Sequence, residues 1–146
     1  MYLADTNVLS LGASGRPDAS ILEWMHINSD SLFMSAVSVA EISAGISKLE
    51  QAGAQTKAIS LGKWLDLLLH LYGERVLPLD ASTARLAGKL IARTRAVGYS
   101  PGFADAAIAA TAGSYGLTVL TRNLRHFIPF GIDVLDPLET LPSLEI

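Results

Sequence analysis

Short hydrophobic runs alternate with longer amphipathic stretches along this chain, and the order predicts alternating strands and helices. We expect strands over residues 1–4, 32–34, 76–79, 118–121 and 132–135. We expect helices from the cap at Asp18, over residues 38–49 and 56–72, from the cap at Asp80 to residue 97, and over residues 104–115, where Gly116 ends the helix. Such alternation is typical of an α/β fold, in which helices cover a parallel sheet.

The 146 residues are expected to form one domain, because this length suits a single core and no repeat, low-complexity tract or linker interrupts the pattern. Gly53 separates the predicted helices over residues 38–49 and 56–72, so we expect these two to pair as a helical hairpin.

Three carboxylates each lie alone in an otherwise uncharged stretch. Asp5 is the only charged side chain in residues 1–15, Glu41 in residues 31–47 and Asp105 in residues 102–121. Burying an ionised carboxylate among apolar neighbours is costly unless another group compensates its charge. If the fold gathers the three, their mutual repulsion adds to that cost, and a bound divalent cation would relieve both. The pattern therefore predicts a metal site with oxygen ligands. Ligands of open α/β sheets bind beyond the carboxyl ends of the strands, where several of these residues are expected.

Each of these residues also has a structural interpretation. The triplet Asp5, Thr6, Asn7 suits a helix N-cap, while its functional interpretation makes Asp5 a metal ligand oriented by its two neighbours. Residues 38–41, from Ser38 to Glu41, match the capping box. Asp105 near a helix N-terminus is worth about 0.3–1 kcal/mol, but its helical face is expected to be buried, which favours a site.

Residues 121–127 follow a predicted strand and concentrate cationic groups near the proposed site. The structural interpretation is a polar loop with Phe127 in the core. The functional interpretation has Asn123 completing the acidic site, while Arg122, Arg125 and His126 contact phosphates.

Composition narrows the function classes. Half of the residues are hydrophobic and 17% are charged, which predicts an interface with another copy or a partner. The net charge of −3 means that nucleic-acid binding must rest on a local basic patch. The chain has no cysteine, so disulfides, cysteine-ligated metals and thiol catalysis are excluded. Phosphate-binding glycine motifs and a serine nucleophile elbow are also absent. Without a signal peptide or membrane-length apolar run, a soluble cytoplasmic protein is expected.

Four motifs, taken in order, resemble the PIN-domain family, and specifically VapC-type toxins of the FitB-like branch. They are Asp5-Thr6-Asn7, Ser38-Val39-Ala40-Glu41-Ile42, the segment from Asp105 to Ala112, and Leu120-Thr121-Arg122-Asn123. The resemblance implies a three-layer α/β/α sandwich with a mostly parallel central sheet. It also implies an endoribonuclease that uses Mg²⁺ or Mn²⁺ to hydrolyse RNA, with tRNA or another structured RNA expected.

By this resemblance the acidic site comprises Asp5, Glu41 and Asp105 as metal ligands, with Asn123 where many PIN domains carry Asp. Orienting or substrate-binding roles fall to six further residues: Thr6, Asn7, Ser38, Thr121, Arg122 and Arg125. The implied partners are a second copy of the chain and an antitoxin that fills the acidic groove. Contact with DNA is expected only through the antitoxin.

Two alternatives remain open. A PIN fold without activity would serve as a binding module for its antitoxin and DNA, and Asn123 in place of an acid leaves this possible. An aspartyl-phosphate phosphatase with Asp5 as nucleophile usually needs a second carboxylate two residues on, where this chain has Asn7.

Overall fold

A five-stranded parallel sheet forms the centre of the computed structural model, which describes residues 1–13 and 18–141. The strands lie in the order β3-β2-β1-β4-β5, and every neighbouring pair is parallel. Their bounds are Tyr2–Ala4 for β1, Leu32–Ser35 for β2, Val76–Leu77 for β3, Thr118–Leu120 for β4 and Val134–Leu135 for β5. The predicted α/β class and five strands are confirmed. β3 is shorter than predicted, and the next residue, Pro78, has no N–H for a sheet hydrogen bond.

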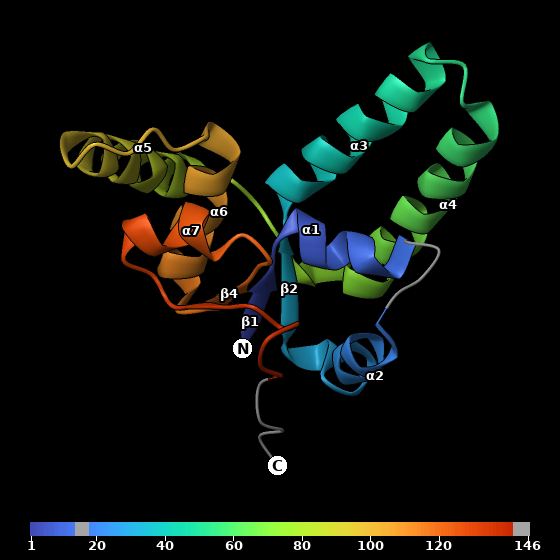
Figure 1. The fold of residues 1–146 in the computed structure, drawn as a ribbon, viewed down its shortest axis with the longest axis horizontal. Helices are drawn as coiled ribbons and strands as arrows, with labels where there is room; N and C mark the ends of the chain where they lie inside the picture. The colour runs from blue at the N-terminus through green and yellow to red at the C-terminus, as the bar shows by residue number, and fades with distance from the viewer. Residues whose placement is uncertain (14–17, 142–146) are drawn as a thin grey trace.

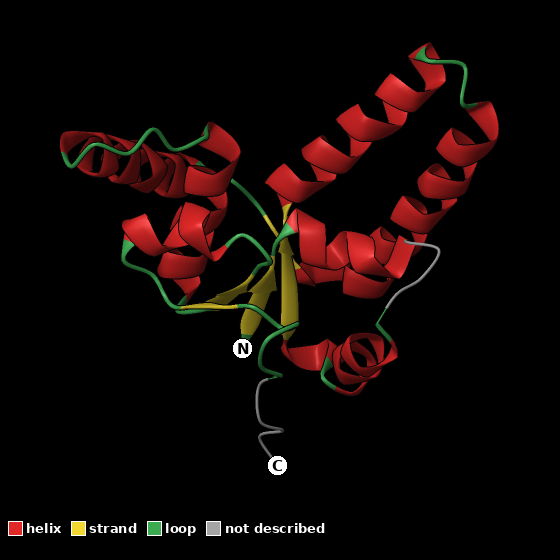
Figure 2. Cartoon of the chain, viewed as in Figure 1, coloured by secondary structure: helices red, strands yellow, loops and turns green. Residues whose placement is uncertain are grey.

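Helices connect the strands and cover both faces of the sheet (Figure 2). The α-helices are α1 Thr6–Leu9, α2 Ala19–Ile27, α3 Ala36–Gln51, α4 Gln55–Tyr72, α5 Ala81–Ala96, α6 Phe103–Tyr115 and α7 Leu124–Phe127. Short 3₁₀ turns follow at η1 Ser10–Ala13, η2 Ser29–Ser31, η3 Gly73–Arg75 and η4 Ile128–Phe130. The hairpin of α3 and α4 was predicted, and the capping interpretation of Asp5 predicted a helix where α1 lies. The one-turn helix α7 was not predicted, because so short a helix leaves little periodicity to detect.

Local end signals act as the sequence predicts. The side chains of Asp18 and Asp80 accept hydrogen bonds from amides in the first turns of α2 and α5. Gly116 ends α6 in the left-handed conformation, with φ of 65°. The predicted start of α3 at Ser38 is wrong, because Ser35 at the end of β2 caps the helix by accepting the Val37 N–H at 3.1 Å.

Side chains alternate between two cores along the strands, as the pleat of a sheet requires. Leu3 and Val119 lie in a core built with α5, α6 and α7. Ala4, Met34 and Leu120 lie in a second core that includes residues of α1, α2 and α4. The two helix groups flank the sheet in Figure 1, and the α3–α4 hairpin extends away from it. The three-layer sandwich is therefore confirmed.

α6 is the most deeply buried helix of the described chain, with every residue from Ala106 to Ala112 buried. Its small side chains let it approach the sheet and α5 closely. This places its first turn, which carries Asp105, near the carboxyl edge of the strands. In the described residues, no helix is both long and apolar enough to cross a membrane.

The strand order reverses between β1 and β4. From β1 the chain adds β2 and β3 on one side, then crosses to add β4 and β5 on the other. A crevice beyond the carboxyl ends of the strands is expected at such a reversal, and it is a common ligand position in open α/β sheets. The residues that directly follow the two strands, Asp5 and Thr121, are therefore placed at this crevice.

Candidate active site at the carboxyl edge of the sheet

Asp5 is buried at the end of β1, with 5% of its surface exposed. Its Oδ1 accepts the Thr6 N–H at 2.8 Å, so it caps α1 as the structural interpretation predicts. Its Oδ2 accepts the Thr121 hydroxyl at 2.9 Å, across 116 positions of sequence. The capping interpretation therefore holds, and the carboxylate also joins the two strands at the sheet reversal.

Burial raises the pKa of the Asp5 carboxyl, because a dry environment disfavours its charged form. The hydrogen bonds from Thr121 and Thr6 lower this pKa, while the negative charges of Asp105 and Glu41 raise it. The other two isolated carboxylates therefore lie near enough to act on Asp5, as the topology predicts.

Thr6 connects the first strand to α3. Its hydroxyl oxygen lies 2.7 Å from Glu41 Oε1 and 2.9 Å from Ser38 Oγ. Ser38 is fully buried, and Glu41 is exposed in the second turn of α3. The predicted capping box is therefore wrong, because the helix begins earlier, at Ala36, and Glu41 contacts Thr6 instead of an N-cap amide.

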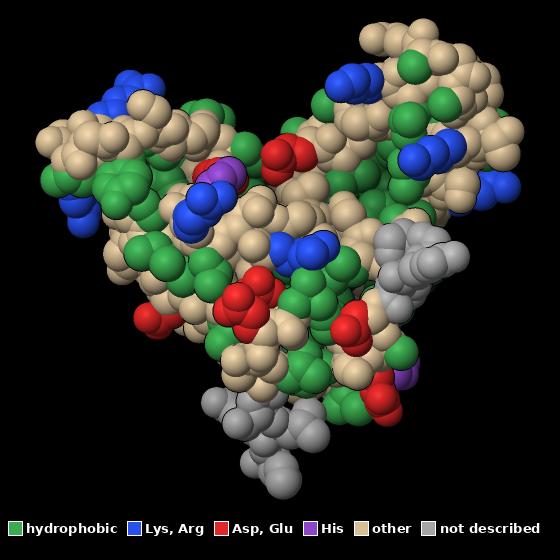
Figure 3. All heavy atoms as spheres, in the orientation of Figure 1, with side chains coloured by type: hydrophobic (Ala, Val, Ile, Leu, Met, Phe, Trp, Pro, Cys, Tyr) green, Lys and Arg blue, Asp and Glu red, His purple; other side chains and the backbone are tan. Residues whose placement is uncertain are grey.

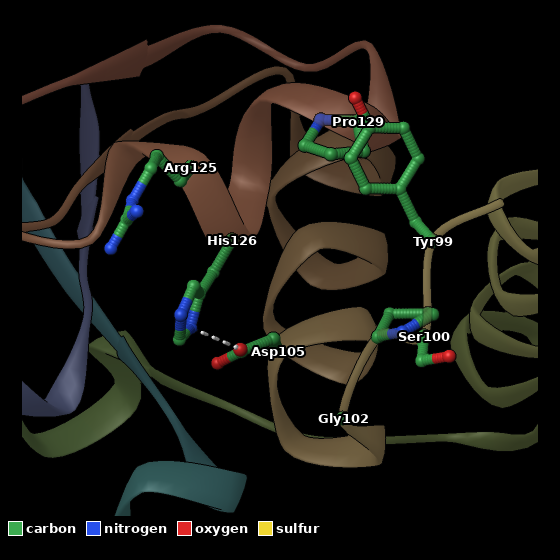
Figure 4. A pocket seen from close by; sticks show the side chains of 8 residues that line it. Tyr99, Ser100, Gly102, Asp105, Arg125, His126 and Pro129 are labelled. Carbon is green, nitrogen blue, oxygen red and sulfur yellow. Dashed lines mark hydrogen bonds and ion pairs between the residues drawn. The ribbon is translucent and has the colours of Figure 1, made fainter.

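Asp105 in the first turn of α6 contacts a residue that no sequence signal connects to it. Its Oδ2 lies 3.2 Å from Nδ1 of His126 on α7 (Figure 4). The Asp105 side chain is 28% exposed and the His126 side chain 56% exposed. His126, for which phosphate contact was predicted, therefore sits against a carboxylate that was predicted to bind metal.

The loop after β4 is tied to the loop after β1. The Arg122 N–H donates to Asn7 Oδ1 at 3.3 Å, and the Asn123 N–H donates to the Thr121 hydroxyl oxygen at 3.0 Å. Asn123 is exposed and its side chain does not cap α7. Arg125 is also exposed. These contacts hold Thr121 against Asp5 while leaving the neighbouring side chains open to solvent.

Phe127 is fully buried and packs edge-on against Phe130, with 6.3 Å between ring centroids. Its predicted place in the core is confirmed. By anchoring α7, it also fixes the preceding residues Arg125 and His126 beside the first turn of α6.

The donor chemistry of the three carboxylates suits a hard divalent cation, since Mg²⁺ and Mn²⁺ prefer oxygen ligands. Within residues 1–13 and 18–141, however, no three His, Asp or Glu side chains lie close enough together to form a ready metal cage. Acidic, histidine and basic side chains nevertheless gather around the notch between the two helix groups (Figure 3). The residues thus fit a metal by chemistry, without a closed coordination shell.

The chain is similar to several known proteins over nearly its whole length. It matches the PIN domain family over residues 2–128. It is 36% identical over 141 residues to the plasmid stability protein StbB of Pseudomonas syringae pv. tomato, with 95% of this chain and 99% of that protein covered. It is 33% identical over 140 residues to the VapC ribonuclease Y4jK of Sinorhizobium fredii, with 95% of this chain and 99% of that protein covered.

Solved structures agree with this match. The crystal structure of FitAcB from Neisseria gonorrhoeae superposes with a TM-score of 0.83 at 30% identity, covering 96% of this chain and 100% of that one. The family predicted from the four motifs is thereby confirmed by sequence and by fold. The chain belongs to the PIN-domain family.

Proposed function

We propose that this protein is the toxin of a VapC-type toxin–antitoxin pair and a metal-dependent endoribonuclease that hydrolyses RNA phosphodiester bonds. The observation that carries the proposal is the convergence of three carboxylates, isolated in sequence, on one edge of the sheet of a PIN-domain chain. The 33% identity to a VapC ribonuclease supports it. An RNA-degrading toxin acts where RNA is made and translated, so we place it in the cytoplasm.

In this proposal Asp5, Glu41 and Asp105 hold Mg²⁺ or Mn²⁺. When bound, such a cation lowers the pKa of a coordinated water and offsets charge on the phosphoryl oxygens. The chain itself fixes the ligands: Thr121 holds Asp5 through Oδ2, and Thr6 holds the Glu41 carboxylate. Ser38 supports the Thr6 hydroxyl from a fully buried position. Asp105 would exchange its contact with His126 for the metal.

Substrate attraction falls to the exposed cations after β4. Arg122 lies in the loop after β4 and Arg125 on α7, both are exposed, and within the described chain neither side chain forms an ion pair. They are therefore available to phosphate oxygens. Asn123 and Asn7 have neutral amides and would orient substrate or water. We expect tRNA or another structured RNA as the substrate, by resemblance to the family.

We propose that a cognate antitoxin occupies the groove next to the site. A pocket of about 420 Å³ opens from Thr6 and Glu41 and continues between α3 and α4, where its lining is largely apolar: Ile42, Ile46, Leu49, Leu61 and Trp64. An apolar groove that begins at an acidic site suits a peptide with apolar side chains and a cationic end. FitAB has been solved bound to a DNA fragment, and we expect this chain to reach DNA only through its antitoxin.

A second copy of the chain is the other proposed partner. A shallow apolar pocket with a volume of about 600 Å³ lies between the start of α3 and the start of α6, and Val37, Pro78, Leu79 and Phe103 line it. Phe103 is 61% exposed there. Light scattering on a sizing column should give a dimer, and Phe103→Glu should shift it to monomer; a monomer in the wild type at micromolar concentration contradicts this interface.

The function is tested by cleavage of total tRNA and a structured RNA pool. Wild type, Asp5→Asn and Asp66→Asn are each incubated with Mg²⁺, Mn²⁺ or EDTA. Asp66 is an exposed carboxylate on α4 outside the site, so its substitution controls for the loss of one charge. We expect discrete cuts that need metal, persist in Asp66→Asn and vanish in Asp5→Asn, with 5′-phosphate and 3′-hydroxyl ends.

Other outcomes separate the alternatives. Cleavage that persists in Asp5→Asn indicates a contaminant or a wrong site. Ends with 2′,3′-cyclic phosphate reject metal-activated water and favour attack by the 2′-hydroxyl of the RNA. Metal and antitoxin binding without cleavage of any RNA favours the inactive binding module, for which Asn123 in place of an acid is the supporting feature.

A further inference from the structure

A further pocket opens directly beside Asp105, and the rest of its lining holds no ligand of the proposed metal site. It encloses about 330 Å³ between α7 and the loop that joins α5 to α6. The loop contributes Tyr99, Ser100, Pro101 and Gly102. The wall opposite this loop contains the Asp105–His126 pair (Figure 4).

The pocket combines a flat aromatic wall with polar and cationic groups. Tyr99 is 52% exposed although its ring is large and apolar, and Pro129 of η4 lines the same cavity. Arg125 and His126 lie at the α7 side, and Ser100 adds a hydroxyl at the loop (Figure 4). Unpaired nucleotides are bound by such sets, because the base stacks on an aromatic ring while cations contact its phosphate.

Electrostatics explains why the site needs such a pocket. The chain carries a net charge of −3, and three carboxylates converge at the site, so phosphate is repelled wherever metal charge does not offset them. Stacking of a base on an aromatic ring does not depend on charge, so an exposed tyrosine beside the site would supply affinity that the acidic groups cannot.

We propose that this pocket binds the base of an unpaired nucleotide adjacent to the bond that is cut, with Tyr99 as the stacking residue and Arg125 on its phosphate. The inference rests on the proposed function, since it assigns the RNA position next to the metal site. An RNA occupant is favoured over a peptide because Asp105 belongs both to this pocket and to the proposed site of phosphodiester hydrolysis. The base and the reacting phosphate would then be neighbours in one strand.

Binding of a fluorescein-labelled, unpaired oligoribonucleotide tests the pocket by fluorescence anisotropy, with Asp5→Asn in every protein to prevent turnover. The variants are Tyr99→Ala, Tyr99→Phe and Tyr115→Ala. Tyr115 is a matched control, being 48% exposed at the far end of α6 and outside the pocket. Loss of one stacked base predicts about 5- to 140-fold weaker binding for Tyr99→Ala. Tyr99→Phe and Tyr115→Ala should bind as the parent does.

A series of RNAs, each with one abasic position, locates the base. In the parent protein one abasic position should weaken binding by the same factor as Tyr99→Ala, and the Tyr99→Ala protein should be insensitive to that position. Unchanged binding by Tyr99→Ala overturns the inference. Equal losses in Tyr99→Ala and Tyr99→Phe also overturn it, because they indicate a hydroxyl contact instead of stacking.

Two further outcomes separate this inference from the proposed function, and a third identifies a different occupant. If wild type cleaves RNA with metal and Tyr99→Ala cleaves it equally well, the pocket assignment fails while the ribonuclease stands. If RNA binds through Tyr99 but is never cut, the pocket stands while the ribonuclease fails. If Tyr99→Ala weakens only antitoxin binding, the pocket belongs to the protein partner and the inference is wrong.

Discussion

The hydroxyl of Thr121 is expected to be a main support of the buried Asp5 carboxylate, and Thr121→Val tests this. Valine has nearly the same shape, so the fully buried position keeps its packing and loses only the hydroxyl. The hydroxyl donates to Asp5 Oδ2 at 2.9 Å and accepts the Asn123 N–H at 3.0 Å. Hydrogen bonds to a charged group contribute about 1.5–3 kcal/mol. The Asn123 amide lies in an exposed loop and can turn to water, so we expect a loss of this size.

The stability lost in Thr121→Val should depend on pH, and the direction of this dependence follows from the pKa of Asp5. Burial raises the pKa of Asp5 in the folded state above its value in the unfolded chain. Asp5 therefore contributes its full share to the free energy of unfolding below the unfolded pKa, and this share is lost as pH rises through the folded pKa. Thr121 opposes that rise, and its removal raises the pKa further. The deficit of Thr121→Val is therefore largest at neutral pH and shrinks in acid, where Asp5 is protonated.

Urea unfolding at neutral pH and in acid measures this difference, with Thr121→Ser as the control. Serine keeps the hydroxyl and loses one buried methyl, which costs about 0.5–1.5 kcal/mol at either pH. In a domain of this size each kcal/mol lowers Tm by roughly 2–4 °C, so thermal unfolding gives a second readout. A Thr121→Val protein as stable as wild type at neutral pH, or a deficit equal at both pH values, would refute the reasoning.

Three other substitutions test separate parts of the structure. Without divalent cation at neutral pH, Asp5→Asn should unfold at a higher urea concentration than wild type, because a buried charge is removed. This gain in stability should vanish in acid, and a lower stability at neutral pH would contradict the raised pKa of Asp5. Phe127→Ala should lose about 3–5 kcal/mol in urea unfolding, since its ring is fully buried, whereas Val97→Ala, at a side chain 69% exposed, should change little. Arg75→Lys should lower the free energy of unfolding by about 1–2 kcal/mol in the same measurement. The guanidinium donates to the carbonyls of Ser29, Leu32 and Leu71 and lies over the Tyr72 ring. A variant as stable as wild type would show that water replaces these contacts.

The candidate site shows how far local sequence information extends. Asp5, Glu41 and Asp105 stand out because each is a lone charge in an apolar stretch, and this depends on sequence alone. The contacts that these carboxylates make cannot be predicted in this way. Thr6 reaches Glu41 across 35 positions, and His126 reaches Asp105 across 21, with no motif that joins either pair. Tyr99 likewise gave no sequence signal, since a tyrosine in a loop gains meaning only from the pocket around it.

Sequence patterns were enough to predict the α/β class, most helix and strand positions, and the caps at Asp18, Asp80 and Gly116. These features follow from periodicity and from hydrogen bonds within one turn, so nearby residues suffice to specify them. Three features became visible in the folded chain alone: the strand order β3-β2-β1-β4-β5, the start of α3 at Ala36 and the contact of Asp5 with Thr121. These depend on how crossover helices pack on the sheet, and that packing joins residues whose separation along the chain carries no local signal.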